Sequence, residues 1–147
     1  MQYLEAQPTP RFANMVKCFW SLEYAPSAVG EPEPVVPDGC VEIIFNLADR
    51  FRRYHPGGQV ETQAASLVAR QMHRSILIGP SGNVHLFGIR FKPAGASPFF
   101  RFGMSDLSDQ VESLRAVWGN DVSGIEDRLA SANRVQERVV VAESVLA

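Results

Sequence analysis

The chain has 147 residues, of which 46% are hydrophobic, 10% aromatic and 20% charged. This balance is typical of one soluble globular domain and excludes a disordered tail or a disulfide-rich miniprotein. The formal net charge is −2. DNA-binding modules use a basic excess to neutralise phosphates, so we expect this chain to bind nucleic acid poorly by itself.

Cysteine usage and hydropathy bear on the cellular compartment. Cys18 and Cys40 have no metal-ligand spacing and no secretory signal ahead of them, so we expect reduced thiols. No stretch approaches the roughly 18 consecutive apolar residues that a membrane-spanning helix requires. We therefore expect a cytoplasmic protein with no membrane partner.

The first part of the chain alternates in the way that half-buried strands do. One face of an expected strand at residues 15–22 carries Val16, Cys18, Trp20 and Leu22. Residues 25–37 contain four prolines, which predicts a long surface loop. Asp38 and Gly39 then predict a turn.

Further strands follow, separated by glycine and proline turns. The clearest spans residues 40–47, with Phe45 on one side and Glu42 on the other. Shorter strands are expected at residues 51–54, 59–65 and 75–78. Residues 83–92 place His85, Phe87 and Phe91 on one face and Arg90 on the other. Several short strands with such turns predict an antiparallel β-barrel or sandwich.

Beyond Pro93 the apolar period changes from two residues to about 3.6, which predicts helices. A short helix is expected to carry Phe99, Phe100 and Phe102 and to end at Gly103. The other expected helices are residues 105–118, a third through Val122, Ile125 and Leu129, and a last one at 134–147 without a stop signal. We therefore expect one α+β domain with a β-rich part, residues 1–93, and a helical part, residues 94–147.

Five segments spread over nearly the whole chain carry a resemblance to a known family. They are CFW at 18–20, VVPDGCVEIIFNL at 35–47, LIGP at 77–80, HLFGIRFKPAGASPFF at 85–100 and MSDLSDQVESLRAVWG at 104–119. This pattern closely resembles the N-terminal domain of a subgroup of AraC/XylS-type bacterial transcription regulators. The resemblance implies a cupin-like barrel with following helices that senses a small-molecule effector.

In regulators of this type the sensor is joined to a C-terminal pair of helix-turn-helix units that read DNA. Such units are missing from the 147 residues, so the resemblance implies the sensor and not the DNA reader. Residues 134–146 are then expected to form the linker toward the DNA-binding part. A ligand would act through different affinities for two arrangements of the helices after Leu107.

Candidate ligand contacts lie on the strands of the expected barrel. Trp20, Phe45, Phe87 and Phe91 are aromatic residues on the face assigned inward, where they line a pocket or simply pack in the core. His85 shares that face and either orients a ligand or is a hydrogen-bonded structural residue. Glu42 and Arg90 either pair across neighbouring strands or bind a polar ligand together.

Candidate dimerisation residues form the apolar stripes of the helical part. They are Val111, Leu114, Trp118 and Ile125, for which packing on the domain's own barrel is an equal alternative. If these residues form a two-fold interface, we expect a homodimer.

Metal and catalytic signals are weak. The three histidines, His55, His73 and His85, are widely separated in the sequence, so we expect no metal site and no cofactor. No nucleophile elbow, phosphate-binding loop or paired-carboxylate motif is present, which indicates that the chain is not an enzyme. Two alternatives remain, namely a stand-alone cupin-like metal-dependent enzyme and an interaction domain whose filled barrel has no pocket.

Overall fold

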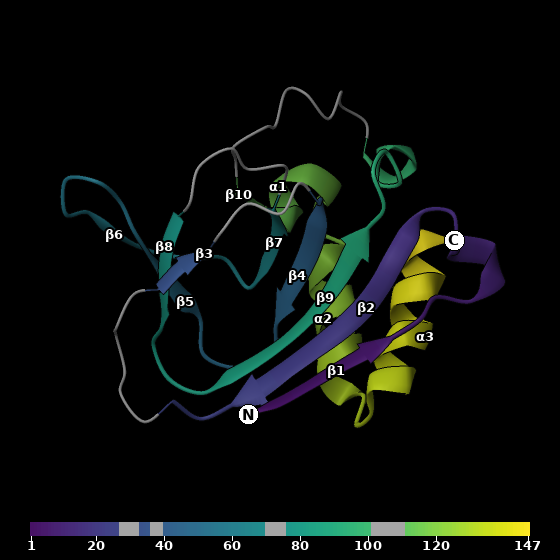
Figure 1. The fold of residues 1–147 in the computed structure, drawn as a ribbon, viewed down its shortest axis with the longest axis horizontal. Coiled ribbons are helices and arrows are strands. Elements are labelled where there is room, and N and C mark those ends of the chain that lie inside the picture. The colour runs from purple at the N-terminus through teal and green to yellow at the C-terminus, as the bar shows by residue number, and fades with distance from the viewer. Residues whose placement is uncertain (27–32, 36–39, 70–75, 101–110) are drawn as a thin grey trace.

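Two antiparallel sheets and a group of helices make up the fold in the computed structural model (Figure 1). The structure describes residues 1–26, 33–35, 40–69, 76–100 and 111–147. The six-stranded sheet has the order β1 (Gln2–Ala6), β2 (Val16–Tyr24), β9 (Val84–Phe91), β4 (Glu42–Asn46), β7 (Ser66–Ala69), β10 (Val111–Ser113). The four-stranded sheet has the order β3 (Glu33–Val35), β8 (Ile76–Pro80), β5 (Phe51–Tyr54), β6 (Val60–Thr62).

The helices belong mainly to the end of the chain. They are α1 (Leu114–Trp118), α2 (Val122–Ser131) and α3 (Val135–Leu146), together with the 3-10 turns η1 (Pro10–Phe12) and η2 (Ser97–Phe99). Helices α2 and α3 lie across one face of the six-stranded sheet (Figure 1). We call this the helix-covered face and the opposite one the inner face.

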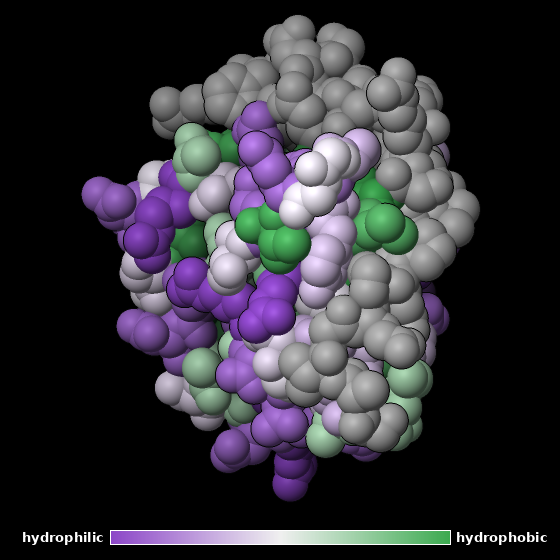
Figure 2. All heavy atoms as spheres, turned by 90° about the vertical axis from the view of Figure 1, so that its left-hand side faces the viewer, coloured by the Kyte–Doolittle hydropathy of each residue, from purple (hydrophilic) through white to green (hydrophobic). Residues whose placement is uncertain are grey.

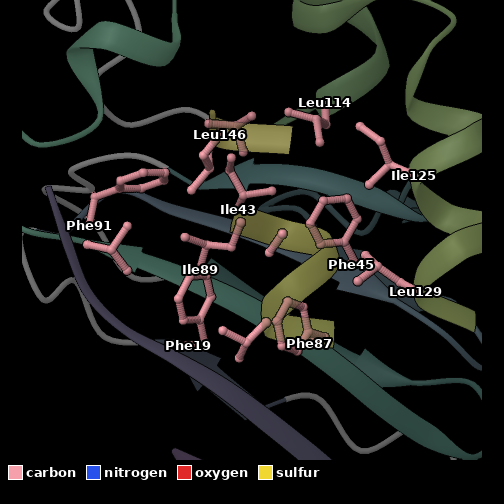
Figure 3. Close-up of a cluster of buried hydrophobic side chains, with 14 of the residues drawn as sticks. Phe19, Ile43, Phe45, Phe87, Ile89, Phe91, Leu114, Ile125, Leu129 and Leu146 are labelled. Atoms are coloured by element: carbon pink, nitrogen blue, oxygen red, sulfur yellow. The ribbon is translucent and has the colours of Figure 1, made fainter. Parts of the chain in front are cut away.

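The hydrophobic core fills the space between the sheet and the helices (Figure 3). On the sheet side it is formed by alternate residues of three central strands, Phe19, Ile43, Phe45, Phe87, Ile89 and Phe91. Leu114, Ile125, Leu129 and Leu146 meet them from the helices. Each such side chain contributes roughly 1.5–3 kcal/mol on burial, so this layer is the main source of stability.

The α+β class is confirmed. The sheets do not close into a barrel over the residues that the structure describes, so the prediction of an antiparallel barrel or sandwich holds only as two antiparallel sheets. The predicted division at residue 93 also needs an amendment, because β10 comes from the part expected to be helical and forms an edge of the six-stranded sheet.

The first predicted strand exists but its predicted face is divided. The pairing of β2 with β9 is shifted between Val16 and Cys18. Val16 consequently shares the helix-covered face with Phe19, whereas Cys18 and Trp20 lie on the inner face. An irregularity of this kind reverses the alternation on its two sides.

The helix predicted at residues 105–118 is wrong from Val111 to Ser113. These residues pair with β7 as strand β10, with Val111 opposite Ala69, and the helix begins only at Leu114. Pairing with β7 satisfies backbone groups that would otherwise form an open sheet edge. Residues 105–110, Phe102 and Gly103 lie outside the described residues, and Phe99 belongs to the turn η2 rather than to an α-helix.

The proline-rich segment contains a strand that the sequence did not predict. Strand β3 lies within the expected loop and pairs antiparallel with β8, with Pro34 opposite Leu77. It is an edge strand, and an edge is where a proline is tolerated in a sheet. The predicted turn at Asp38 and Gly39 lies outside the described residues.

Candidate functional site

The inner face of the six-stranded sheet carries a cluster of polar and aromatic side chains. The strand registers place Trp20 opposite Gly88, and Arg90 opposite both Cys18 and Glu42. Residues opposite each other in neighbouring strands point to the same side. The expected ion pair between Glu42 and Arg90 is formed, with the Arg90 Nε donating to Glu42 Oε1.

Arg90 lies at the centre of this cluster. Its Nη1 is 4.0 Å from Glu5 Oε1 and 4.0 Å from Cys18 Sγ, and Glu5 Oε1 accepts a hydrogen bond from the Tyr3 hydroxyl at 2.8 Å. Burial disfavours the charged guanidinium, but hydrogen bonding to Glu42 and attraction by its carboxylate outweigh this and raise the pKa of Arg90. The arginine therefore stays charged and its charge is compensated within the cluster.

The thiol of Cys18 responds differently to the same surroundings. Burial raises its pKa, against a smaller opposing effect of Arg90. A thiol with a raised pKa is protonated at neutral pH and is a poor nucleophile. Cys18 therefore acts as a packing residue of the cluster.

Trp20 forms the aromatic part of the inner face. Its ring stacks on that of Tyr3, with centroids 6.4 Å apart and an interplanar angle of 23°. The indole Nε1 is buried and has no hydrogen-bond partner in the described part of the chain. A buried donor of this kind is uncommon, because buried polar groups are normally paired.

A small cavity lies between the inner face and the four-stranded sheet. Its volume is about 60 Å³. The six-stranded sheet contributes Ile44, Leu67 and Leu86, the four-stranded sheet contributes Phe51 and Ile78, and Asn46, Gln63, Ala64 and Ala65 complete the lining. The walls are thus apolar, with two amides.

The two amides of the cavity differ in their partners. Asn46 is engaged in a turn, since its Nδ2 donates to the Asp49 carbonyl at 3.0 Å and its Oδ1 accepts from the Ala48 N–H at 3.0 Å. Gln63 is 7% exposed. No hydrogen bond of its side-chain amide is found within the described part of the chain, and the amide atoms are not among the fully buried unpartnered ones, which are Trp20 Nε1 and His85 Nε2. The amide therefore keeps some accessible surface and is open to water or to a molecule in the cavity.

The surface over the four-stranded sheet is mostly hydrophilic in its described part, with separate hydrophobic spots (Figure 2). Two exposed hydrophobic side chains come from strands of this sheet, Val60 of β6 and Leu77 of β8. Scattered exposed apolar residues of this kind are normal for a protein surface.

The structure brings together three of the six predicted ligand residues. Trp20 of β2, Glu42 of β4 and Arg90 of β9 lie on the inner face, and β4 and β9 also carry the cavity-lining residues Ile44 and Leu86.

The other three, Phe45, Phe87 and His85, point to the helix-covered face, as does Phe91. The face assigned inward was the wrong one, because α2 and α3 and not the second sheet cover the aromatic side. Ile44, Leu86 and Gln63 were missed. Alternation of the strands did place Ile44 and Leu86 together on one face, opposite the aromatic residues.

The predicted dimerisation residues are mostly engaged within their own domain. Leu114 is fully buried and Ile125 is 9% exposed, both in the hydrophobic core. Trp118 is half-buried, and its Nε1 donates to the Phe99 carbonyl at 2.9 Å. Val111 lies in the edge strand β10. Packing on the domain itself, the alternative interpretation, accounts for Leu114, Trp118 and Ile125.

Two further searches cover the described residues only. No group of three or more His, Cys, Asp or Glu side chains is placed to hold a metal ion there, and His73 lies outside that part. None of the described helices has the length and apolar character needed to span a bilayer.

Fold and site together define an α+β domain with a candidate small-molecule site between two sheets. Residues 4–113 match the family described as a domain of unknown function (DUF6597). Because this match covers well over half of the chain, the protein belongs to that family. No curated protein and no solved structure matches the chain.

Proposed function

We propose that this chain is the ligand-sensing and dimerisation domain of a cytoplasmic AraC-type transcription regulator, with a cupin-like arrangement of its sheets. The family match names no function, so the proposal depends on the sequence resemblance and on the site. The effector is a small molecule that binds between the inner face and the four-stranded sheet.

The polar side chain of Gln63, largely buried in a mostly apolar lining, is the observation that carries this proposal. Gln63 is 7% exposed and lines the cavity. A binding site needs a polar group to recognise its ligand, and Gln63 supplies one between two apolar walls.

The same strands supply both the cavity lining and the support for the helices. Ile44 of β4 lines the cavity, while its neighbours Ile43 and Phe45 pack in the core beneath α2 and α3. Interiors are close-packed, so a displacement of β4 by ligand is transmitted to the helices. A ligand with different affinities for two helix arrangements could then control an attached DNA-binding part.

DNA contact itself is assigned to helix-turn-helix units outside this chain. The formal net charge of −2 agrees with a sensor that does not grip phosphates. Since Leu114 and Ile125 are buried in one domain, dimerisation would use other surfaces, and light scattering at several protein concentrations measures whether a dimer forms.

Two measurements test the function. The first is a thermal-denaturation screen of uncharged and charged small metabolites, in which a true effector raises the melting temperature in a saturable manner because it binds only the folded state. The second reads the gene beyond codon 147. The proposal expects a basic segment with two helix-turn-helix patterns there. A reading frame without such units overturns the regulator assignment, and the absence of any stabilising compound overturns the sensor.

A further inference from the structure

From the chemistry of the cavity we infer the class of ligand, which is a small uncharged molecule with a compact apolar body and one polar group that pairs with the amide of Gln63. This inference rests on the proposed sensor function and goes beyond it by excluding charged effectors. Three observations support the inference: the residues that line the cavity, the volume of the cavity and the free hydrogen-bonding capacity of the Gln63 amide.

The described lining provides no charge for a ligand. The nine lining residues that the structure describes are apolar or carry neutral amides. An ammonium or carboxylate that entered such a site would lose its hydration without gaining a counter-charge, which costs several kcal/mol. Glu42 and Arg90, which lie on the same face of the six-stranded sheet, already form an ion pair with each other.

The size of the cavity limits the part of the ligand that it encloses. Its volume of about 60 Å³ is less than half of the roughly 150 Å³ that binds a benzene ring in an engineered protein cavity. A body of only a few heavy atoms therefore fits without rearrangement of the walls.

Hydrogen-bonding capacity selects the polar group. Because Asn46 uses both ends of its amide in the turn with Ala48 and Asp49, Gln63 is the polar side chain of the described lining that is available to a ligand. An amide both donates and accepts, so a ligand group that accepts and donates in turn satisfies it best. Primary amides and alcohols have this property.

Three probes of similar size separate the effect of charge from that of shape: propionamide, propionate and propylammonium. Each is titrated at the same millimolar concentrations into isotope-labelled protein at neutral pH, and chemical shifts are followed by NMR. We expect propionamide alone to shift the signals of the Gln63 side-chain amide and of the Ile44 and Leu86 methyl groups, with saturation.

The variant Gln63→Leu removes the amide and keeps an apolar side chain of similar size. We expect at least a tenfold weaker binding of propionamide, because the polar group of the probe loses its partner. The matched control is Gln59→Leu, which makes the same change at an exposed position of the β5–β6 hairpin and should leave binding unchanged. Gln63→Met serves as a second apolar variant if the leucine variant folds poorly.

A separate readout comes from stability without any probe. Because no hydrogen bond within the described part of the chain is lost, we expect Gln63→Leu to keep the melting temperature at or above that of the unliganded wild type while it weakens binding. A variant that lost binding and stability together would indicate a structural role for the amide.

Several outcomes contradict the inference while the sensor function stands. These are equal binding of propionate or propylammonium at the cavity, no shift with propionamide, and unchanged binding in Gln63→Leu. An effector from the thermal screen that bound away from the cavity would also overturn the inference alone. The sensor proposal fails only if the whole screen yields no ligand.

Discussion

Trp20 of β2 lies across Gly88 of β9, and the contact leaves no room for a side chain at the glycine. A Cβ atom at Gly88 would lie 2.1 Å from Cε2 and 2.3 Å from Nε1 of the indole. Cβ atoms do not approach other heavy atoms so closely, so the absence of a side chain at Gly88 is what seats the tryptophan on the inner face. The buried position of Trp20, 7% exposed, depends on it.

Replacing Gly88 by alanine should therefore destabilise the domain. Overpacking of a filled site typically costs about 1–3 kcal/mol, because the neighbouring side chain must leave its position. The measurement is urea-induced unfolding, with the emission wavelength of Trp20 recorded in a Trp118→Phe background as a second signal. We expect a lower midpoint and a red-shifted native emission from the displaced indole.

Gly124 in α2 provides the matched control. A Cβ atom there meets no heavy atom within 4 Å, and alanine favours the helix, so Gly124→Ala should raise stability by about 0.4–1 kcal/mol. Equal effects of the two substitutions would show that the contact between Trp20 and Gly88 does not constrain the site.

Breaking the ion pair between Glu42 and Arg90 should also destabilise the domain. Its side chains are 14% and 24% exposed, so Glu42→Ala leaves a largely buried guanidinium without its hydrogen-bonded carboxylate. Hydrogen bonds to charged groups contribute about 1.5–3 kcal/mol, and we expect a loss of that order in the free energy of unfolding. Chemical denaturation at neutral pH measures it.

A double-mutant cycle with Arg90→Met shows whether the two residues act as a pair. Residues in direct contact typically couple by about 0.5–3 kcal/mol, so the double variant should be more stable than the sum of the single losses implies. Strictly additive losses would mean that each side chain is held by other groups, such as Glu5 at 4.0 Å from Arg90.

Sequence periodicity predicted which residues share a face, but not what covers that face. In β9 the alternation correctly separated Phe87 and Phe91 from Arg90, and in β4 it separated Phe45 from Glu42. Both faces of these strands are partly apolar, so hydrophobicity alone could not decide between the helices and the second sheet. For this reason the sequence left open whether the aromatic residues line a pocket or pack in the core, and Phe45, Phe87 and Phe91 pack in the core.

The pairing of strands far apart in the chain and the burial of polar residues could not be predicted from the sequence either. The apolar spacing of Val111, Leu114 and Trp118 fits a helix, yet pairing with β7 makes Val111 part of a strand. Gln63 lies in the segment 59–65 that was expected to be one strand, whereas β6 ends at Thr62, and a glutamine at this point gives no local sign of burial. Its burial results from the approach of two sheets, which no local pattern records.

The contacts of Arg138 indicate that it holds the C-terminal end of α2 in place. It is 8% exposed, and its guanidinium donates to the Ala132 carbonyl at 2.9 Å and to the Leu129 carbonyl at 3.4 Å. These carbonyls lie at the C-terminal end of α2, where backbone acceptors lack partners within the helix. Arg138→Met should therefore cost about 1–3 kcal/mol.

Arg128 is a suitable comparison for Arg138. It is exposed and donates to the Ser144 hydroxyl at 3.0 Å, and surface substitutions usually change stability by less than about 0.5 kcal/mol. Thermal unfolding of Arg128→Met and Arg138→Met under the same conditions compares the two. A similar small change in both would show that the buried contacts of Arg138 contribute little.

His85 on the helix-covered face predicts how stability depends on pH. Its Nε2 is buried without a partner in the described part of the chain. Burial lowers the pKa of His85, the positive charge of Arg138 lowers it further, and Glu23 opposes both. The folded state thus binds the proton less readily than the unfolded state does.

The sign of the effect follows from this difference. The stability that the neutral His85 contributes is fully present above the ordinary histidine pKa of about 6.5. It is lost as pH falls from there through the lower pKa of the folded state, because protons then favour the unfolded chain. We therefore expect the denaturation midpoint to decrease as pH is lowered from about 8 to about 5. In His85→Gln this part of the pH dependence should disappear, whereas His55→Gln should retain it.

Arg138→Met provides a second test. It should raise the pKa of His85 that is measured by NMR, since it removes the nearby positive charge. A pH profile that His85→Gln leaves unchanged would assign the acid sensitivity to other groups.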